Sequence, residues 1–307
     1  VKLFERAFTH KRFGCHLNVE VGENFTHADL MAHHHAVIYA VGASHSRQLG
    51  IPGEELPGNH GAAEFVGWYN GHPDHAGRDF DLSGERAVIV GNGNVALDAA
   101  RMLLMPAAEL ANTDIAQHAL DALAHSNIRE VVIVARRGLR AAAFSVGEFL
   151  ALAHLDGIDV VIDGDDPSAD PDDDVETAIK LEAARAHAAR PATPGNKRIV
   201  FKFLATPTEV LGTDAVTGLR VTGTDDGAVE DIPTSLLLRS IGYRGAPLGD
   251  LEFDQAAGIV PNTDGRVLDA ADRPVPGVYV TGWIKRGPRG VIGTNRTCAE
   301  ETVDHLF

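Results

Sequence analysis

The chain has 307 residues, 44% of them hydrophobic, and a formal net charge of −16. A chain of this length and composition is expected to fold into about two globular domains, and its acidic balance argues against nucleic-acid binding, which requires clustered Lys and Arg. No stretch approaches the roughly 18 consecutive apolar residues of a transmembrane helix, so we expect no membrane-spanning segment.

The two cysteines, Cys15 and Cys298, lie far apart in the sequence, and no C-x-x-C pair occurs. This argues against a disulfide framework and against a dithiol flavoprotein of the thioredoxin-reductase kind, and it favours a reduced, cytoplasmic setting. Cys298 is expected to be a core thiol. The charged first residues lack an initiator Met and do not form a signal peptide, which is typical of a fragment or of one domain of a longer protein.

The first predicted element is a buried strand over residues 36–43, followed by a loop-rich stretch with Pro-Gly pairs up to about residue 82. Beyond it, apolar strand segments alternate with helical patterns, which predicts an α/β fold with a mainly parallel sheet. Further strands are expected before Gly91 and over 129–138, 158–163, 236–243 and 277–283, with a strand pair formed by 198–212 and 218–223. Helices are expected after Gly93, near 115–125, over 175–190 and from 292 onward.

A glycine motif follows the strand that leads into Gly91. The sequence GNGNVA matches G-x-G-x-x-A and opens a helical pattern, which is the context in which this motif holds a dinucleotide pyrophosphate. Glycines let the backbone approach the phosphates closely, and the amides at the helix N-terminus face them. The alternative is a purely structural tight turn.

The next strand ends in Arg136-Arg137-Gly138, where an NAD-binding unit carries an acid for the ribose 2′-hydroxyl. Two guanidinium groups can pair with a 2′-phosphate and stack on adenine, so the expected ligand is NADP. The alternative is a solvated charge pair. About 30 residues separate the first helix from this strand, which is more than a usual connection.

A third cluster spans residues 277–303. Its strand leads to Thr281-Gly282-Trp283, then to a basic loop rich in Gly and Pro, and then to the start of a helix at Gly290. Backbone amides at a helix N-terminus favour an anionic group. The cluster is therefore a candidate for a second phosphate or for an electron-rich ring.

The stretches GNGNVALDAAR, VVIVARRG, RSIGYRG and GWIKRGPRGVIGTN together resemble ferredoxin–NADP reductases of the adrenodoxin-reductase-like family, actinobacterial type. The resemblance covers nearly the whole chain. It implies two Rossmann-like dinucleotide-binding domains, with an NADP-binding domain (83–238) inserted in an FAD-binding domain (1–82 and 239–307). It also implies that electrons pass from NADPH through FAD to a ferredoxin, an iron–sulfur protein.

The family's binding residues are carried over by motif. The NADP pyrophosphate is expected at Gly93, Asn94, Val95 and Ala96, the 2′-phosphate at Arg136 and Arg137, and the nicotinamide half at Glu148. FAD is expected at Trp283, Gly290, Val291 and Ile292, with Gly290 also contacting NADP.

Two departures from the family pattern limit what is carried over. The family's opening G-x-G-x-x-(G/A) loop for FAD is absent, so the FAD domain is expected to be incomplete at its N-terminus and to hold FAD weakly. The family also places an acid three residues after Glu148, where this chain has Ala151, so no catalytic residue is assigned.

Several alternatives stay open. One is a truncated or regulatory NADP-binding module without flavin chemistry, and another is an electron-transfer module similar to the glutamate synthase small subunit. The Asp-rich run 163–174 is either a calcium loop or a solvated acidic loop. His33-His34-His35 could bind a metal, but consecutive side chains on a helix diverge, so we expect no metal site. The basic residues Lys285, Arg286, Arg289 and Arg296 either dock an acidic ferredoxin or offset the charge of cofactor phosphates.

Overall fold

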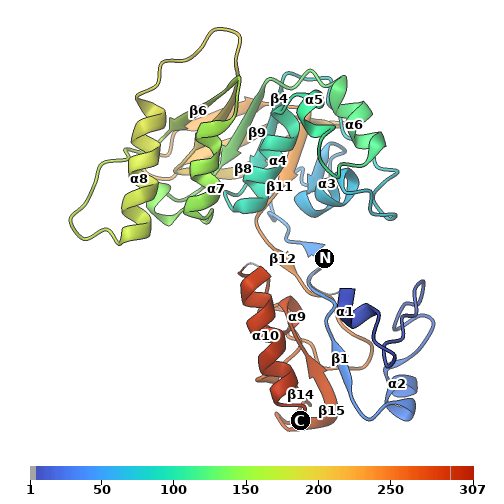
Figure 1. Ribbon diagram of the computed structural model, residues 1–307. Helices are drawn as coiled ribbons and strands as arrows, with labels where there is room; N and C mark the ends of the chain where they lie inside the picture. Colours follow the sequence, from blue (N-terminus) through green and yellow to red (C-terminus); the bar gives the residue numbers. More distant parts are fainter. Residues whose placement is uncertain (1–4, 291) are drawn as a thin grey trace. The chain divides into compact units, whose positions relative to one another are not determined.

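The computed structural model describes residues 5–290 and 292–307, and the chain divides into two compact units (Figure 1). The central unit is Ser46–Gly242, and the terminal unit joins residues 5–45 to Tyr243–Phe307. The central unit is thus inserted in the sequence of the terminal unit, as the fold class requires. Residues 46–82 belong by their contacts to the central unit. The assignment of residues 83–238 to NADP, and of 1–82 and 239–307 to FAD, remains a prediction.

A six-stranded parallel sheet forms the middle of the central unit, in the order β3-β11-β4-β5-β7-β6. Each neighbouring pair runs parallel, so the carboxyl ends of the strands share one edge. The strands are β3 (Asn59–Gly61), β4 (Arg86–Val90), β5 (Glu130–Val134), β6 (Ile158–Asp163), β7 (Lys197–Lys202) and β11 (Leu236–Arg239).

Helices cover one face of this sheet. Figure 1 shows α4, α7 and α8 lying across it. Successive side chains of a strand point to opposite faces, and the inward residues Ala87 and Ile89 of β4 join the helices in one hydrophobic core. The helices are α3 (Ala62–Tyr69), α4 (Asn94–Leu104), α5 (Ala107–Leu110), α6 (Gln117–Ala124), α7 (Val146–Ala151) and α8 (Val175–Ala188), with 3₁₀ turns η2 (Leu139–Ala141) and η3 (Leu152–His154).

The opposite face carries an antiparallel sheet in the order β10-β9-β8. Val88 and Val90 of β4 pack against it in a second core. The expectation of a simple strand pair over 198–212 and 218–223 is wrong in one respect, because 198–212 contains two strands: β7 joins the parallel sheet, and only the second pairs with β9. The three strands are β8 (Ala205–Gly212), β9 (Val216–Gly223) and β10 (Val229–Pro233).

The terminal unit holds a four-stranded sheet in the order β1-β15-β14-β13. Its core gathers Val278 and Val280 of β15 with Tyr39 of β1 and Ile284 of α9. The elements are α1 (Glu5–Phe8), α2 (His27–His33), β1 (Val37–Tyr39), β13 (Asn262–Thr263), β14 (Arg266–Leu268), β15 (Pro274–Val280), α9 (Trp283–Arg286) and α10 (Ile292–Asp304). Two short strands, β2 (His45–Ser46) and β12 (Tyr243–Arg244), pair where the chain passes from one unit to the other.

Among the described residues, none of the helices combines the length and the apolar character that crossing a bilayer demands.

Candidate functional site

The glycine turn lies at the carboxyl edge of the parallel sheet, between β4 and α4. Gly91 has φ +105°, and a Cβ there would stand 2.3 Å from the carbonyl oxygen of Ser240. The Gly91 amide donates to the carbonyl of Val134 at the end of β5, at 2.9 Å. Only glycine tolerates both the positive φ and this close approach, so the turn is held tightly against two neighbouring strand ends.

The second glycine of the motif faces open space. Gly93 caps α4 without a side-chain hydrogen bond, and no heavy atom lies within 4 Å of the position that its Cβ would take. The first turn of a helix carries unsatisfied amides and the positive end of the helix dipole. An anionic group can therefore reach the backbone of Gly93, Asn94 and Val95.

The remaining motif residues have structural contacts. The Ala96 amide donates to the carbonyl of Gly93 at 2.9 Å, and its methyl group is fully buried. The side chain of Asn94 accepts a hydrogen bond from the Ser145 amide at 2.8 Å. Ser145 is the N-cap of α7, so Asn94 ties the glycine turn to the helix that carries Glu148.

The arginine pair follows β5, the strand next to β4 in the sheet. Arg136 and Arg137 are both exposed, and among the described residues neither guanidinium takes part in an ion pair or a side-chain hydrogen bond. Guanidinium groups can bind a dianion such as a 2′-phosphate with charge-assisted hydrogen bonds, and the assignment of this pair to that phosphate remains a prediction. The structure therefore places the predicted phosphate-binding residues on adjacent strand ends.

Glu148 is held in place by an arginine that the sequence analysis missed. Arg101 of α4 donates through Nη2 to the carboxylates of both Glu148 and Asp98. Burial lowers the pKa of Arg101, but the two carboxylates more than offset that effect and the pKa is raised. The sequence offered one signal for this arginine: the Asp98-x-x-Arg101 spacing on a predicted helix. Residues three apart lie on one face of a helix, so an ion pair between these two could have been expected.

In the terminal unit, Trp283 opens α9 directly after Gly282, whose φ is +72°. The Trp283 ring stacks on Tyr243 with ring centroids 5.8 Å apart. Its indole Nε1 is buried and has no hydrogen-bond partner within the described residues. A buried donor without a partner is costly, so this N–H is a candidate to contact a bound group.

The other residues expected at FAD lie at the start of α10. Gly290 has φ +83°, and a Cβ there would stand 2.6 Å from Oγ1 of Thr294. Ile292 is the first residue of α10. Val291 lies outside the described residues.

The basic residues of the loop after Trp283 divide between bonded and exposed positions. Lys285 is only 8% exposed, and its ammonium donates to Glu301 and, at 3.3 Å, to Thr302. Arg286 donates to the carbonyl of Arg289 and to the side chain of Asn295. Both cations are therefore used within the terminal unit, because α10 packs its polar residues onto this loop, and they are not free for a partner protein.

The remaining basic residues of that loop are at the surface. Arg289 is exposed, and Arg296 is exposed with an ion pair to Glu300 at 2.9 Å. Cys298 is buried and accepts a hydrogen bond from the Gly282 amide at 3.3 Å, which fits a core thiol.

The candidate metal ligands do not gather. Within the described part of the chain, no group of three or more His, Cys, Asp or Glu is arranged to hold a metal ion. The imidazole of His34 contacts the carbonyl of its own helix at Leu30, at 2.9 Å. In the acidic loop, Asp165 and Asp173 bond instead to the Leu139 amide and the Arg140 guanidinium.

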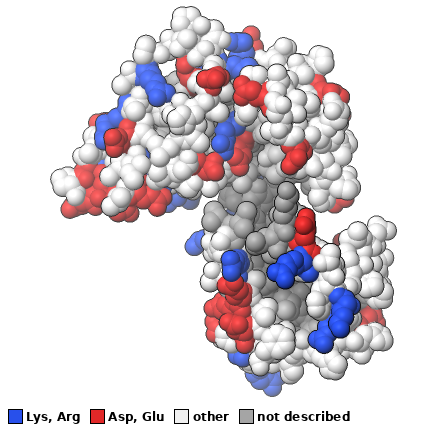
Figure 2. Space-filling view, in the orientation of Figure 1, with Lys and Arg blue, Asp and Glu red and all other residues white. Residues whose placement is uncertain are grey.

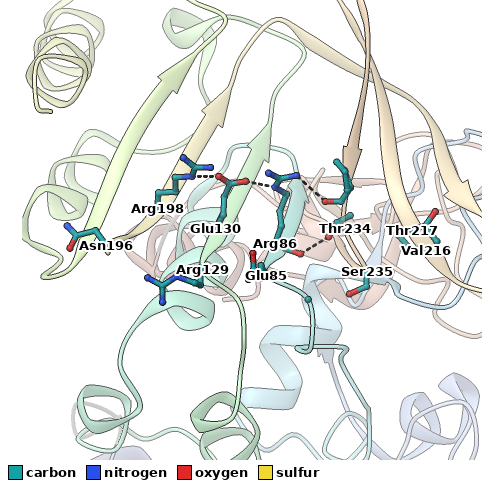
Figure 3. Close-up of a pocket in the computed structure, with 12 residues that line it drawn as sticks. Glu85, Arg86, Arg129, Glu130, Asn196, Arg198, Val216, Thr217, Thr234 and Ser235 are labelled. Carbon is teal, nitrogen blue, oxygen red and sulfur yellow. Dashed lines mark hydrogen bonds and ion pairs between the residues drawn. The ribbon is translucent and has the colours of Figure 1, made fainter. Parts of the chain in front are cut away.

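A cavity of about 650 Å³ lies at the opposite, amino edge of the parallel sheet. Figure 3 shows that Glu130 stands between Arg86 and Arg198 in its lining and bonds to both. These three residues are direct cross-strand neighbours on β4, β5 and β7. The charges in the lining are thus largely paired across the sheet, and we assign them to stability rather than to the cofactor.

Comparison with known proteins places the chain in a family. The chain matches no protein-family model. It is 49% identical to the "Probable ferredoxin/ferredoxin--NADP reductase" of Mycobacterium tuberculosis over 316 aligned residues, which cover 99% of this chain and 54% of that protein. The chain thus spans about half the length of this relative.

Two further relatives match the whole chain. NADPH-ferredoxin reductase FprA of Mycobacterium tuberculosis is 46% identical and NADPH:adrenodoxin oxidoreductase of Arabidopsis thaliana mitochondria is 39% identical, in each case over 100% of this chain and 70% of the relative. The solved structure of FprA in complex with NADPH superposes with a TM-score of 0.93 over 99% of this chain and 70% of FprA. With this identity, coverage and fold, the chain belongs to the adrenodoxin-reductase-like family of ferredoxin–NADP reductases.

Proposed function

We propose that this chain is the NADP-binding part and a portion of the FAD-binding part of a reductase that passes electrons from NADPH to a ferredoxin. The observation that carries the proposal is the exposed, uncompensated pair Arg136 and Arg137 beside the open glycine turn at Gly93. This arrangement suits a dinucleotide with a 2′-phosphate. The names of the relatives and the NADPH complex of FprA support it.

Different residues of the central unit would bind different parts of NADPH. The amides at the start of α4 would hold the pyrophosphate, and the arginine pair would hold the 2′-phosphate. Glu148, fixed by Arg101, would orient the nicotinamide half. When bound, NADPH and FAD supply hydride and one-electron transfer, while the protein aligns and tunes them.

The terminal unit has features that fit FAD. The buried Nε1 of Trp283 lacks a partner among the described residues, and no heavy atom lies within 4 Å of the Cβ position of Gly282. The stacked Tyr243 and Trp283 rings offer an apolar wall, and burial raises the pKa of Tyr243. A planar, hydrogen-bonding ring system suits such a wall.

The electron acceptor would be an acidic iron–sulfur protein. Of the four basic residues considered for docking, Arg289 and Arg296 are exposed, so docking would depend on these two. We also propose a cytoplasmic location. It is supported by two free cysteines, of which Cys15 is exposed, since extracellular proteins commonly pair their cysteines.

Isothermal titration calorimetry with NADP⁺ and NAD⁺ tests the first part of this proposal. We expect NADP⁺ to bind at least 10-fold more tightly, because two charge-assisted contacts depend on the 2′-phosphate. The visible absorbance of the purified protein and NADPH-dependent reduction of a ferredoxin test the second part. NADP⁺ binding without any flavin binding, even with added FAD, would favour a regulatory NADP-binding module instead.

A further inference from the structure

The acidic loop, residues 163–174, contains seven Asp and lies against the arginine turn, residues 136–140. Oδ2 of Asp165 accepts a hydrogen bond from the Leu139 amide at 2.6 Å. A Cβ on Gly138 would stand 2.6 Å from that same oxygen. Because Gly138 has an ordinary φ of −70°, the backbone conformation does not oppose a methyl group there, but that group would displace the Asp165 carboxylate.

A second contact joins the loop to the end of the turn. Arg140 donates through Nε and Nη2 to the two carboxylate oxygens of Asp173, at 2.8 and 3.2 Å, and through Nη2 to the carbonyl of Ser168 at 2.7 Å. The hydrogen bond from Arg140 is the main reason why the pKa of Asp173 is lowered. The Arg140 side chain is 41% exposed, so solvent screens the pair, and we weigh the geometry that it imposes more than its energy.

Further contacts within the central unit hold the arginine turn and the acidic loop in place. The hydroxyl of Thr224 donates to the carbonyl of Arg136 at 3.1 Å. The acidic loop is itself anchored by Arg185 of α8, which donates to the carbonyl of Pro167 at 2.7 Å, and by the ion pair of Lys202 with Asp163 at 2.7 Å. The backbone of the turn is therefore fixed on both sides of the arginine pair.

These contacts leave the arginine pair uncompensated although it lies near many carboxylates. Figure 2 shows acidic side chains gathered at the left edge of the view, over the loop that precedes α8. Yet within the described residues neither Arg136 nor Arg137 has a carboxylate partner. The carboxylates of Asp165 and Asp173, which contact the turn, bond to Leu139 and Arg140 instead.

We propose that Asp165 is a positioning residue for the arginine pair, and that the acidic loop thereby sets the preference for a cofactor with a 2′-phosphate. This inference rests on the proposed binding of NADP. Asp165 holds the Leu139 amide, which fixes the path of the backbone immediately after Arg137 and Gly138. A turn held in this way presents two guanidinium groups to one anion without a large loss of chain entropy on binding.

The proposal predicts an effect opposite in sign to that of simple electrostatics. As a negative charge, Asp165 repels the phosphate, so its removal should tighten NADP⁺ binding. As a hydrogen-bond acceptor, Asp165 orients the pair, so its removal should weaken binding. At about 0.1 M salt the Debye length is about 10 Å, and the repulsion is screened, whereas the orienting contact is not.

The test is calorimetric titration of the wild type, Asp165→Ala, Asp165→Asn and Asp172→Ala with NADP⁺ and NAD⁺. We expect Asp165→Ala to weaken NADP⁺ about 10-fold, through partial loss of a charge-assisted contact, and to leave NAD⁺ binding unchanged. Asp165→Asn should restore most of the affinity, because its amide oxygen still accepts from Leu139. Asp172, an exposed residue of the same loop, is the matched control: its removal should leave NADP⁺ binding equal or slightly tighter.

A second variant guards against misfolding of Asp165→Ala. Gly138→Ala preserves every charge but displaces the Asp165 carboxylate, so it should weaken NADP⁺ and not NAD⁺. NADP⁺ binding that is unchanged or tighter in Asp165→Ala, or NAD⁺ binding that weakens equally, would overturn the inference while a wild-type preference for NADP⁺ stands. A wild type with no such preference would overturn the proposed function and the inference with it.

Discussion

Arg101 of α4 donates a hydrogen bond to the carboxylate of Glu148 on α7, 47 residues further along the chain. The same guanidinium nitrogen also donates to Asp98 on its own helix. The bridge links the helix that opens at the glycine turn to the residue expected at the nicotinamide half. A substitution of Arg101 should therefore change the orientation of the Glu148 side chain, although Arg101 itself is not expected to contact the cofactor.

Replacing Arg101 by Gln should weaken NADP⁺ binding a few-fold, because Glu148 loses the cation that orients it and the bond is partly exposed. Calorimetry measures the change. Asp98→Asn is the control, since Asp98 contacts Arg101 but not Glu148. If both variants weaken binding equally, Arg101 does not act through Glu148.

Neutralising one arginine of the pair should affect NADPH and NADH differently. We expect Arg136→Gln or Arg137→Gln to weaken NADPH by about 10- to 150-fold, the cost of one charge-assisted contact, and to leave NADH nearly unchanged. Steady-state kinetics with both cofactors measure this. Arg190→Gln, an exposed arginine that follows α8 in the same unit, should change neither. Equal losses for NADPH and NADH would contradict the 2′-phosphate assignment.

The two glycines of the turn should respond differently to alanine. Gly91→Ala combines a φ of +105° with a contact of 2.3 Å to a backbone oxygen, so we expect it to lower the free energy of unfolding by about 2–5 kcal/mol. Gly93→Ala has space for its methyl group and should fold with an unchanged Tm. It should nevertheless weaken NADP⁺, because the methyl group occupies the approach to the helix amides. Chemical denaturation and calorimetry distinguish the two effects, and tight NADP⁺ binding by Gly93→Ala would place the pyrophosphate elsewhere.

Glu130 should matter for stability and not for cofactor binding. Its side chain is 10% exposed and bonds to Arg86 and Arg198, so Glu130→Gln loses an acceptor for one of them. We expect a loss of about 1–3 kcal/mol in the free energy of unfolding, limited because both arginines reach solvent. Glu85→Gln, an exposed neighbour in the same cavity, should have little effect. A change in NADP⁺ affinity of Glu130→Gln at unchanged stability would assign the amino edge a role in binding.

The stability of the central unit should depend on pH through His187. This residue is 4% exposed on α8, with its ring edge against Phe149. Burial, and then the nearby Arg190, lower its pKa. As the pH drops through about 6.5, the ordinary pKa of histidine, His187 is protonated more readily in the unfolded chain than in the folded one. The free energy of unfolding should therefore fall over that pH range. Urea unfolding at pH 7.5 and 5.5 should show a smaller difference for His187→Gln than for the wild type, while the exposed His154→Gln should behave as the wild type.

The sequence by itself determined the features that depend on near neighbours in the chain. The glycine turn, the helix after it and the arginine pair lie on short, continuous motifs, and the alternation of apolar strands with helices indicated the α/β class. Each of these follows from local conformational preference and hydrophobic period. The match to a ferredoxin–NADP reductase family also came from such motifs.

Only the tertiary structure decided which distant residues meet. The stretch 198–212 divides between two sheets: in its first half, Ile199 and Phe201 pack into one core and Val200 against the other, and this strand lies between β5 and β6. Lys285 is buried because α10 packs over it and supplies Glu301. Asp165 reaches Leu139, and Arg101 reaches Glu148, across 26 and 47 residues. These contacts depend on strand order and helix packing, and a local sequence pattern does not determine which strands are neighbours in the sheet.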